Sequence, residues 1–431
     1  MLLRFPKPTR RRFFQAAGLG LAAAAAISVL DGCDSTDDEV DSDPVVVEED
    51  SAESVFETFE EADLTLTASN TWTFDVGNVF HPAEGAWVPV TTTGAAASPM
   101  VVAQALSTVS GELVEVVSAP ISTSSNAVIY SVHCSDKVYA WVELDLVTRD
   151  WVLYASGFSA GALTGTTTTL WEGTSEWDPA PFAVSGSTVF WQVQPSLLGS
   201  STGEYSHLYL WHLGDTTAEA VLESQGRFAT DPTISGAHVI VTPRVLPDEG
   251  TYYGIAAYTV ADDMGTRVDQ LVMPQTVKPF HASRVGDRFL VSVEASYSTG
   301  GLLGQMGTYM GTEALGFTKL VREPSALGCG KDDVFLIKST SSYFVLDLAN
   351  KTYSVLYSYD RAVDYGEYPA REGEVEQFVT FATVKDEDTG YPANVIVRTF
   401  DLDAADEDET DETGEADADA ESDADDSEAS E

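Results

Sequence analysis

The feature of this sequence that most constrains its fold is a run of β-type residues that returns about every 50 positions. Each run follows a small or polar turn, as in "SDKVYAWV" at Ser135, "SGAHVIVTP" at Ser235 and "VGDRFLVSV" at Val285. The first strongly β-forming residues of the seven runs are separated by 51, 51, 50, 50, 45 and 44 residues. They are Trp87, Val138, Val189, Val239, Phe289, Val334 and Phe378. A supersecondary unit repeated at this period is typical of a β-propeller blade.

Each unit contains further apolar stretches that predict four strands. A second stretch ends in a polar residue, as in "HLYLWHLGD" from His207 and "SYFVLDLAN" from Ser342. A third run follows, such as "AEAVLES" from Ala218, and a short stretch such as "PTIS" at Pro232 precedes the turn. These stretches are rich in β-branched and aromatic residues, which pleated, half-buried surfaces favour. The sequence therefore predicts an all-β protein, a β-propeller of seven four-stranded blades, with six or eight blades as the alternatives.

The repeated turns and strands resemble those of bacterial β-propellers with TolB-like or WD40-like repeats. The resemblance rests on the "SG", "GD" or "DD" turn before the apolar run and on strands such as "LYLWHL" and "FVLDL". No unit combines the Gly-His and the Trp-Asp of a true WD40 repeat. The resemblance implies a propeller over residues 63–402. Its TolB side implies an assembly factor that recognises envelope proteins through one face.

The last unit runs out of sequence before its fourth strand. After "NVIVRTFDL" the chain turns acidic, and a propeller must join its two ends or leave a sheet edge exposed. We expect Asp63–Phe74, "DLTLTASNTWTF", to form the missing outer strand of the last blade. The alternative is that this segment extends an acidic stalk.

The first 32 residues have the layout of an export signal. A basic segment precedes about 15 apolar or small residues, too few for the roughly 20 that span a bilayer. The order Thr9-Arg10-Arg11-Arg12-Phe13 resembles the twin-arginine motif, with Arg10, Arg11 and Phe13 as its matching residues. The alternative is a helix anchored with its basic end inside.

The end of this leader resembles a bacterial lipobox, in which cleavage precedes a lipid-modified cysteine. Leu30-Asp31-Gly32-Cys33 supplies the leucine, the small residue and the cysteine. Asp31 departs from the family pattern, which has a small uncharged residue there. The resemblance implies lipidation at Cys33 and a chain anchored to the outer face of the cytoplasmic membrane. An uncleaved leader or a conventional cleavage site is the alternative.

Two acidic segments flank the predicted ring. Fourteen acids and no Lys or Arg lie in residues 34–63, and 17 acids with no base lie in residues 401–431. Such runs repel themselves and bury little apolar surface, so residues 33–62 are predicted to form a disordered stalk and residues 403–431 a disordered tail. With 69 acidic and 22 basic residues, the chain lacks the cationic clusters that nucleic acid requires.

The sequence assigns no catalytic, cofactor-binding or metal-binding residue, and we expect no cofactor. The six histidines are scattered among the units, and His207 and His212 lie five apart in one strand, which places them on opposite faces. Cys134 and Cys329 are predicted to be free thiols. Asp386, Glu387 and Asp388 are interpreted as a hairpin tip, with a calcium loop as the alternative.

Two further features leave alternatives open. Residues Trp171, Trp177, Trp191 and Trp211 are interpreted as wedges between blades, with sugar stacking as the alternative. Residues 298–311, "STGGLLGQMGTYMG", are expected to form a flexible loop on one face or a disordered insertion.

Taken together, these features favour a binding or scaffold module that recognises an envelope protein or glycan through one propeller face, and the protein is expected to be a monomer. A glycoside hydrolase or lyase with carboxylates in the channel is the alternative. Converging carboxylates with an aromatic platform would favour the enzyme, and a plugged channel with an apolar patch on one face would favour partner binding.

Overall fold

The computed structural model describes residues 42–62, 66–93, 100–201, 203–321, 326–363 and 366–402 of the 431-residue chain. Strands dominate this part of the chain, and its helices are the four-residue α1 (Val55–Thr58) and the 3-10 turn η2 (Leu302–Gly304). None of the helices within these ranges is long and apolar enough to cross a bilayer. Cys33, Arg10, Arg11 and Phe13 lie outside the described residues, as does the predicted tail at 403–431.

The strands form seven sheets, one for each sequence unit. Sheet 1 contains β4 (Asn78–Phe80), β5 (Trp87–Thr93), β6 (Met100–Ser107) and β7 (Leu113–Val117). Sheet 2 contains β8 (Ala127–Cys134), β9 (Val138–Asp145), β10 (Trp151–Ser159) and β11 (Ala162–Gly173). Sheet 3 contains β12 (Phe182–Ser185), β13 (Thr188–Val193), β14 (Ser206–His212) and β15 (Glu219–Ser224).

Sheets 4 to 7 have the same antiparallel order of four strands. Sheets 4, 5 and 6 contain extra short strands, and the outer strand of sheet 7 comes from the N-terminal part of the chain. Sheet 4 contains β16 (Thr233–Ser235), β17 (His238–Val241), β18 (Arg244–Val245), β19 (Tyr252–Thr259) and β20 (Arg267–Val272). Sheet 5 contains β21 (His281–Val285), β22 (Arg288–Val293), β23 (Gly307–Thr312), β24 (Gly316–Leu320) and β1 (Glu53–Ser54). Sheet 6 contains β25 (Gly328–Lys331), β26 (Val334–Lys338), β27 (Ser342–Asp347), β28 (Thr352–Tyr357), β2 (Glu60–Glu61) and β30 (Gly373–Glu374). Sheet 7 contains β29 (Tyr368–Pro369), β31 (Gln377–Lys385), β32 (Pro392–Asp401) and β3 (Asn70–Asp75).

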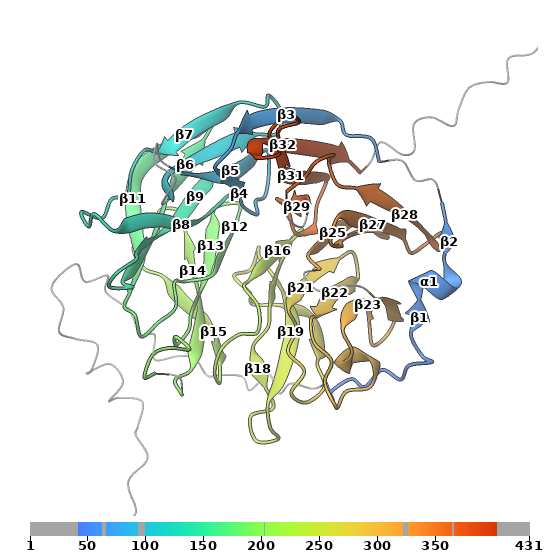
Figure 1. Ribbon diagram of the computed structural model, residues 1–431. Helices are drawn as coiled ribbons and strands as arrows, with labels where there is room; N and C mark the ends of the chain where they lie inside the picture. The colour runs from blue at the N-terminus through green and yellow to red at the C-terminus, as the bar shows by residue number, and fades with distance from the viewer. Residues whose placement is uncertain are drawn as a thin grey trace, which may run out of the picture.

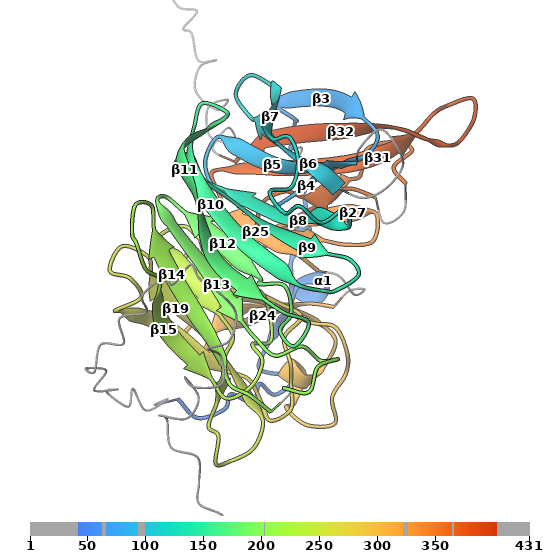
Figure 2. The ribbon, with the colours of Figure 1, turned by 90° about the vertical axis from the view of Figure 1, so that its left-hand side faces the viewer.

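The sheets are arranged around a central axis, with the first strand of each unit innermost (Figure 1). The predicted all-β propeller is therefore confirmed. Central strands such as β9 and β13 are buried along nearly their whole length, because each sheet packs against a neighbour on both faces. The side view in Figure 2 shows these sheets stacked beside one another.

Aromatic side chains fill the space between neighbouring sheets. Trp191 and Trp211, at 0% and 2% exposure, pack with Trp151 in one cluster between sheets 2 and 3. Trp171 and Trp177 are partly buried against the same cluster. The structure confirms the interpretation of these tryptophans as wedges.

An N-terminal strand completes the last sheet, as predicted, but it spans Asn70–Asp75 and not the whole of residues 63–74. In an antiparallel register, Asn70 pairs with Thr399 and Asp75 pairs with Asn394, so β3 is the outer strand beside β32. Trp72 and Phe74 pack against a cluster that joins sheet 7 to sheet 1 through Phe80 and Val397. An early strand, β3, and the last strand, β32, thus lie side by side in one sheet (Figure 1).

Residues 42–62, which we call the strap, correct the prediction of a disordered stalk. The strap runs along the outer edges of three sheets: Val45 N donates to Val272 O at 3.0 Å in sheet 4, β1 pairs in parallel with β24, and β2 pairs in parallel with β28. Val55 is fully buried and Phe59 is 8% exposed. These apolar residues, spaced among the acids, bury enough surface to order the segment despite its charge.

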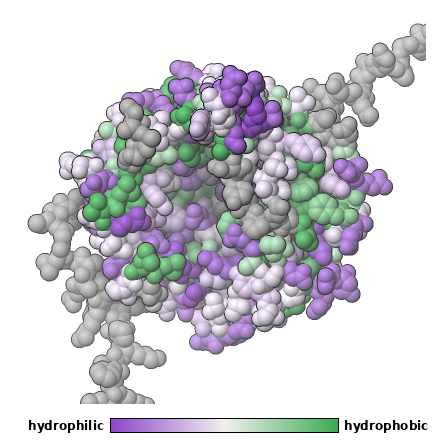
Figure 3. Space-filling view, viewed as in Figure 1, coloured by the Kyte–Doolittle hydropathy of each residue, from purple (hydrophilic) through white to green (hydrophobic). Residues whose placement is uncertain are grey.

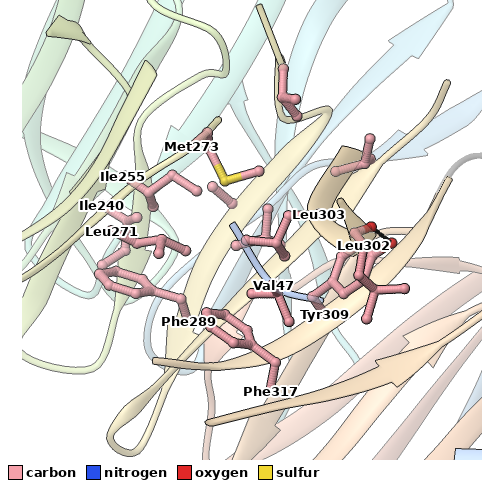
Figure 4. Close-up of a cluster of buried hydrophobic side chains, with 14 of the residues drawn as sticks. Val47, Ile240, Ile255, Leu271, Met273, Phe289, Leu302, Leu303, Tyr309 and Phe317 are labelled. Carbon is pink, nitrogen blue, oxygen red and sulfur yellow. Dashed lines mark hydrogen bonds between the residues drawn. The ribbon is translucent and has the colours of Figure 1, made fainter. Parts of the chain in front are cut away.

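The strap also takes part in the core between sheets 4 and 5. Val47 is 6% exposed and packs in a cluster with Leu302 and Leu303, and Leu302 N donates to Val47 O at 2.7 Å (Figure 4). The glycines of residues 298–311 led us to expect a flexible loop or a disordered insertion, and this expectation is wrong. These residues contribute η2 to this cluster and continue into β23, in which Met310 is buried, because their leucines and Tyr309 face the core.

Candidate functional site

The alternation of strand direction separates the connections into two ends of the ring. Because neighbouring strands within each meander are antiparallel, turns between first and second strands share one end with turns between third and fourth strands. We call this end the turn end. Connections between second and third strands, and those between successive sheets, lie at the opposite end, which we call the loop end.

The segment that connects β29 to β31 in sheet 7, and that contains β30, crosses the centre of the ring. We call residues 370–376 the plug, since they contact four other sheets. The guanidinium of Arg371 donates from Nη2 to the Gly85 carbonyl in sheet 1, and Glu374 N donates to Ser235 Oγ at 2.9 Å in sheet 4. Gly286 N of sheet 5 donates to Glu374 Oε2 at 3.3 Å, and β30 pairs in parallel with β25 of sheet 6.

The plug requires a glycine at its closest approach to the channel wall. Gly373 has a φ of +73°, and a Cβ at this position would lie 2.8 Å from the Ile234 carbonyl oxygen. Arg371 is 6% exposed, and its burial lowers its pKa below the usual value while nearby acids oppose that shift. The channel is therefore filled by backbone and by a buried guanidinium.

Both free cysteines lie near this arginine. Cys134 ends β8, Cys329 lies in β25, both are fully buried, and both interact electrostatically with Arg371. Burial raises the pKa of both thiols far above their usual range. Both cysteines are free thiols, as predicted.

An acidic cavity of about 520 Å³ opens beside the plug, lined by loop-end connections of sheets 3 to 6. Asp231 lies between β15 and β16, Lys278 between β20 and β21, and Glu294 between β22 and β23. Glu372 of the plug forms part of its floor. Figure 3 shows the molecule hollowed near the centre of the ring.

The carboxylates of this cavity are electrostatically perturbed. Burial, followed by the nearby Asp231 carboxylate, raises the pKa of Glu372 to about 7. Burial also raises the pKa of Asp231, although the Arg227 and Lys278 charges oppose the shift. Arg227 itself pairs with Asp178 at 2.6 Å. Such perturbed carboxylates in a cavity are typical of functional sites.

A smaller cavity of about 40 Å³ lies deeper in the channel, beside Glu84, His133 and Cys134. Burial lowers the pKa of His133 to about 3, so the ring is neutral. The volume suits ordered water, whereas ligand pockets are several times larger.

The other residues considered in the sequence have local partners. His207 Nε2 lies 3.2 Å from Glu223 Oε2, and His212 Nε2 lies 2.8 Å from Asp263 Oδ1, so the two histidines do not form one site. Asp386 Oδ1 accepts the N–H groups of its own turn, at 3.2 and 2.9 Å. Across the described ranges, no group of three or more His, Cys, Asp or Glu residues could hold a metal ion.

The sequence analysis missed the cavity residues. Asp231 and Glu372 resemble many other acids of the chain, and only the fold distinguishes them. A weak signal was present in the seventh unit, which has the longer segment "YPAREGEVEQ" where other units have a two-residue turn. That irregularity in the repeat marks the plug.

No protein-family model and no curated protein matches the sequence. Among solved structures, the fold is similar to the β-propeller domain of the Trilobed protease from Pyrococcus furiosus, at 9% identity and a TM-score of 0.46, covering 77% of this chain and 97% of that one. It is also similar to oligogalacturonate lyase from Vibrio parahaemolyticus, at 9% identity and a TM-score of 0.42, covering 79% and 95%. For an acylaminoacyl peptidase from Pyrococcus horikoshii the identity is 10%, the TM-score is 0.39, and the match covers 60% of this chain and 43% of that one.

Proposed function

We propose that this protein is a binding module: a seven-bladed propeller whose loop end recognises an envelope protein or a glycan. The observation that carries the proposal is the plug. It fills the channel at the level of Arg371 and Glu374, so the large cavity faces the loop end only. A rigid ring with a closed channel and a concave end suits recognition of a partner better than passage or processing of a chain through the ring.

Exposed apolar residues on the same end support a protein partner. Leu146 and Val147 lie between β9 and β10, and Leu197 and Leu198 lie between β13 and β14. Their exposed fractions are 49%, 71%, 71% and 98%. Exposed apolar side chains that gather at one end of a domain favour an interaction with another protein.

The enzymatic alternative has one specific observation in its favour. Glu372 and Asp231 are two carboxyl groups whose pKa values are raised in one cavity, and a carboxyl group protonated near neutral pH suits a general acid. The paired carboxylates of glycoside hydrolases follow this logic. Turnover of a glycan that is lost in both Asp231→Asn and Glu372→Gln would establish this second function.

Two charge reversals in sheet 5 test the binding role. Glu294 lies at the loop end and Glu313 in the turn between β23 and β24, and both are exposed. We expect Glu294→Lys to weaken capture of an envelope protein or arrayed glycan at least tenfold, because it replaces a carboxylate of the cavity wall with a positive charge. Glu313→Lys is the matched control and should leave binding within twofold. The assay uses the exported chain carrying Cys33→Ala, and equal effects of the two reversals would contradict the proposal.

We also propose that the ring is tethered to the membrane through a lipid on Cys33. The strap begins at Ser42, beside Gln270 of sheet 4. Residues 34–41 extend at most about 30 Å, given about 3.6 Å per residue, so the edge of sheet 4 would lie close to the bilayer. The tether is then much shorter than a stalk of 30 residues.

Metabolic labelling with a fatty acid tests the tether. We expect label in the full-length protein, recovery in the membrane fraction, and loss of both in Cys33→Ala, because the thiol of this cysteine is the acceptor. Arg10→Lys together with Arg11→Lys should block export of the same protein. Label that persists in Cys33→Ala would refute lipidation at this position.

A further inference from the structure

The cavity at the loop end carries more negative than positive charge. Asp231, Glu294 and Glu372 face it together with a single cation, Lys278. Asp231 interacts electrostatically with Arg227 and Lys278, which only partly offset the effect of its burial. Burial raises the pKa of Asp231 and of Glu372, and repulsion from Asp231 adds to the shift of Glu372, so an added positive charge would stabilise the ionised form of both carboxyl groups.

His281 provides an independent indication of a ligand. Its side chain is 5% exposed, it lines the same cavity, and its Nε2 has no hydrogen-bond partner among the described residues. Burial lowers the pKa of His281 to about 4, while a hydrogen bond to the Gly328 backbone acts in the opposite direction. The ring is therefore neutral, and with one nitrogen bonded to Gly328 the other is an acceptor for an N–H donor.

Two aromatic side chains complete the wall. Phe280, 40% exposed, and Tyr297, partly buried, border the cavity beside Lys278 and Glu294. Aromatic faces attract ammonium and guanidinium groups, most strongly where water is partly excluded. Carboxylates, a neutral acceptor nitrogen and aromatic faces together match a ligand that is cationic and donates N–H bonds.

We propose that this cavity binds an organic cation, an ammonium or guanidinium group, presented by the partner of the loop end. The proposal rests on the binding function above and specifies its chemistry. A volume of about 520 Å³ accommodates a lysine or arginine side chain or an amino sugar. The described acids do not gather into a group that could hold a metal ion, which favours the larger cation.

Calorimetric titration of the exported chain carrying Cys33→Ala tests the inference. The cationic probes are N-acetyl-lysine amide, N-acetyl-arginine amide and a glucosamine oligomer, which separate a protein source from a glycan source. The neutral and anionic probes are N-acetyl-norleucine amide and N-acetyl-glutamate amide. We expect at least one cationic probe to bind at least tenfold more tightly than either of these.

Variants locate the binding. Asp231→Asn and Glu372→Gln should each weaken the cation at least tenfold, since each removes one of the facing charges. Asp248→Asn is the control, because Asp248 is exposed on the same sheet's loop end and does not line the cavity. It should change binding less than twofold, and near-ultraviolet circular dichroism should show that all three variants are folded.

Proton release adds a readout that a general loss of folding would not produce. Near pH 7 the cation should displace protons from Glu372, whose pKa is raised to about 7, and binding should tighten from pH 5.5 to pH 8, while the His281 ring stays neutral. Equal binding of the neutral probe, or cation binding unchanged in both variants, would overturn the inference. Partner capture that is sensitive to Glu294→Lys without any cation binding would overturn this inference alone, whereas cation binding without any partner would overturn only the proposed function.

Discussion

A chain that begins at Gly77 instead of Asp34 is expected to lose most of its folding stability. This deletion removes the strap and β3 together, and with them the outer strand of sheet 7 and the parallel additions to sheets 5 and 6. Val55, Phe59, Trp72 and Phe74 leave the core or its margin. Burial of a large apolar side chain contributes about 1.5–3 kcal/mol, so the combined loss should reach about 5 kcal/mol or more.

The physical reason is that ring closure depends on a strand from the opposite end of the chain. Without β3, the backbone groups of β32 form an exposed edge, which also favours aggregation. Thermal and urea unfolding of chains that begin at Asp34, Leu66 and Gly77 should rank in that order of stability. The intermediate chain keeps β3 and loses the strap, so it separates the two contributions.

A peptide of residues 42–76 should restore stability to the shortest chain when it is added in trans, because it carries both pairing segments. Equal melting temperatures for the chains that begin at Asp34 and Gly77 would mean that the observed strand pairing contributes little. A loss confined to the step from Asp34 to Leu66 would assign the stability to the strap rather than to closure.

The repeat and the closure could be predicted from the sequence because both depend on local patterns. The turn before each apolar run recurs at nearly constant spacing, and Trp72 and Phe74 lie in an alternating segment ahead of the first unit. Alternation of this kind indicates a strand wherever the segment finds a partner. The last unit lacks a fourth strand of its own, so the edge of its third strand was the expected partner of this segment.

The strap could not be predicted, because its composition conceals its few apolar contacts. Fourteen acids lie in residues 34–63, and this charge outweighs Val47, Val55 and Phe59 in any average over the segment. These three side chains are ordered by grooves between sheets that exist only in the folded ring. Composition indicates whether a segment can fold by itself. The strap is ordered only because it packs against the folded ring, and its composition does not reveal this.

The site escaped prediction for a related reason. Its chemistry arises where the plug of sheet 7 meets connections from sheets 3 to 6, and these segments are up to about 140 residues apart in sequence. Asp231 and Glu372 differ from surface acids in their surroundings and not in their neighbours along the chain. The sequence repeat predicts at which end of the ring each connection lies. It does not predict which side chains meet there, because that depends on the conformation of the loops.

The second large effect is expected at a buried ion pair where sheets 6 and 7 meet. Glu367 is fully buried; its Oε1 accepts from Arg398 Nε at 2.7 Å and from the Thr380 hydroxyl, and its Oε2 accepts from Tyr359 N at 3.1 Å. Arg398 also donates to the Tyr357 carbonyl at 3.1 Å, which ties β32 to β28. The guanidinium therefore holds the two sheets together through one carboxylate.

Arg398→Met should lower the free energy of unfolding by about 3–5 kcal/mol, because it leaves a buried carboxylate without its counter-charge. The double variant Glu367→Gln with Arg398→Met should recover part of this loss, since a neutral amide costs less to bury than an unpaired carboxylate. Urea unfolding of the four members of this cycle measures the coupling.

Arg361→Met is the matched control. Arg361 lies near the same sheets and pairs with Glu387 at 3.2 Å, but it is 38% exposed, so its loss should cost less than about 1 kcal/mol. A loss in Arg398→Met no larger than that in Arg361→Met would show that the buried pair does not hold the two sheets together. A double variant less stable than Arg398→Met would show that Glu367 acts through Thr380 and the Tyr359 backbone, and that the arginine is secondary.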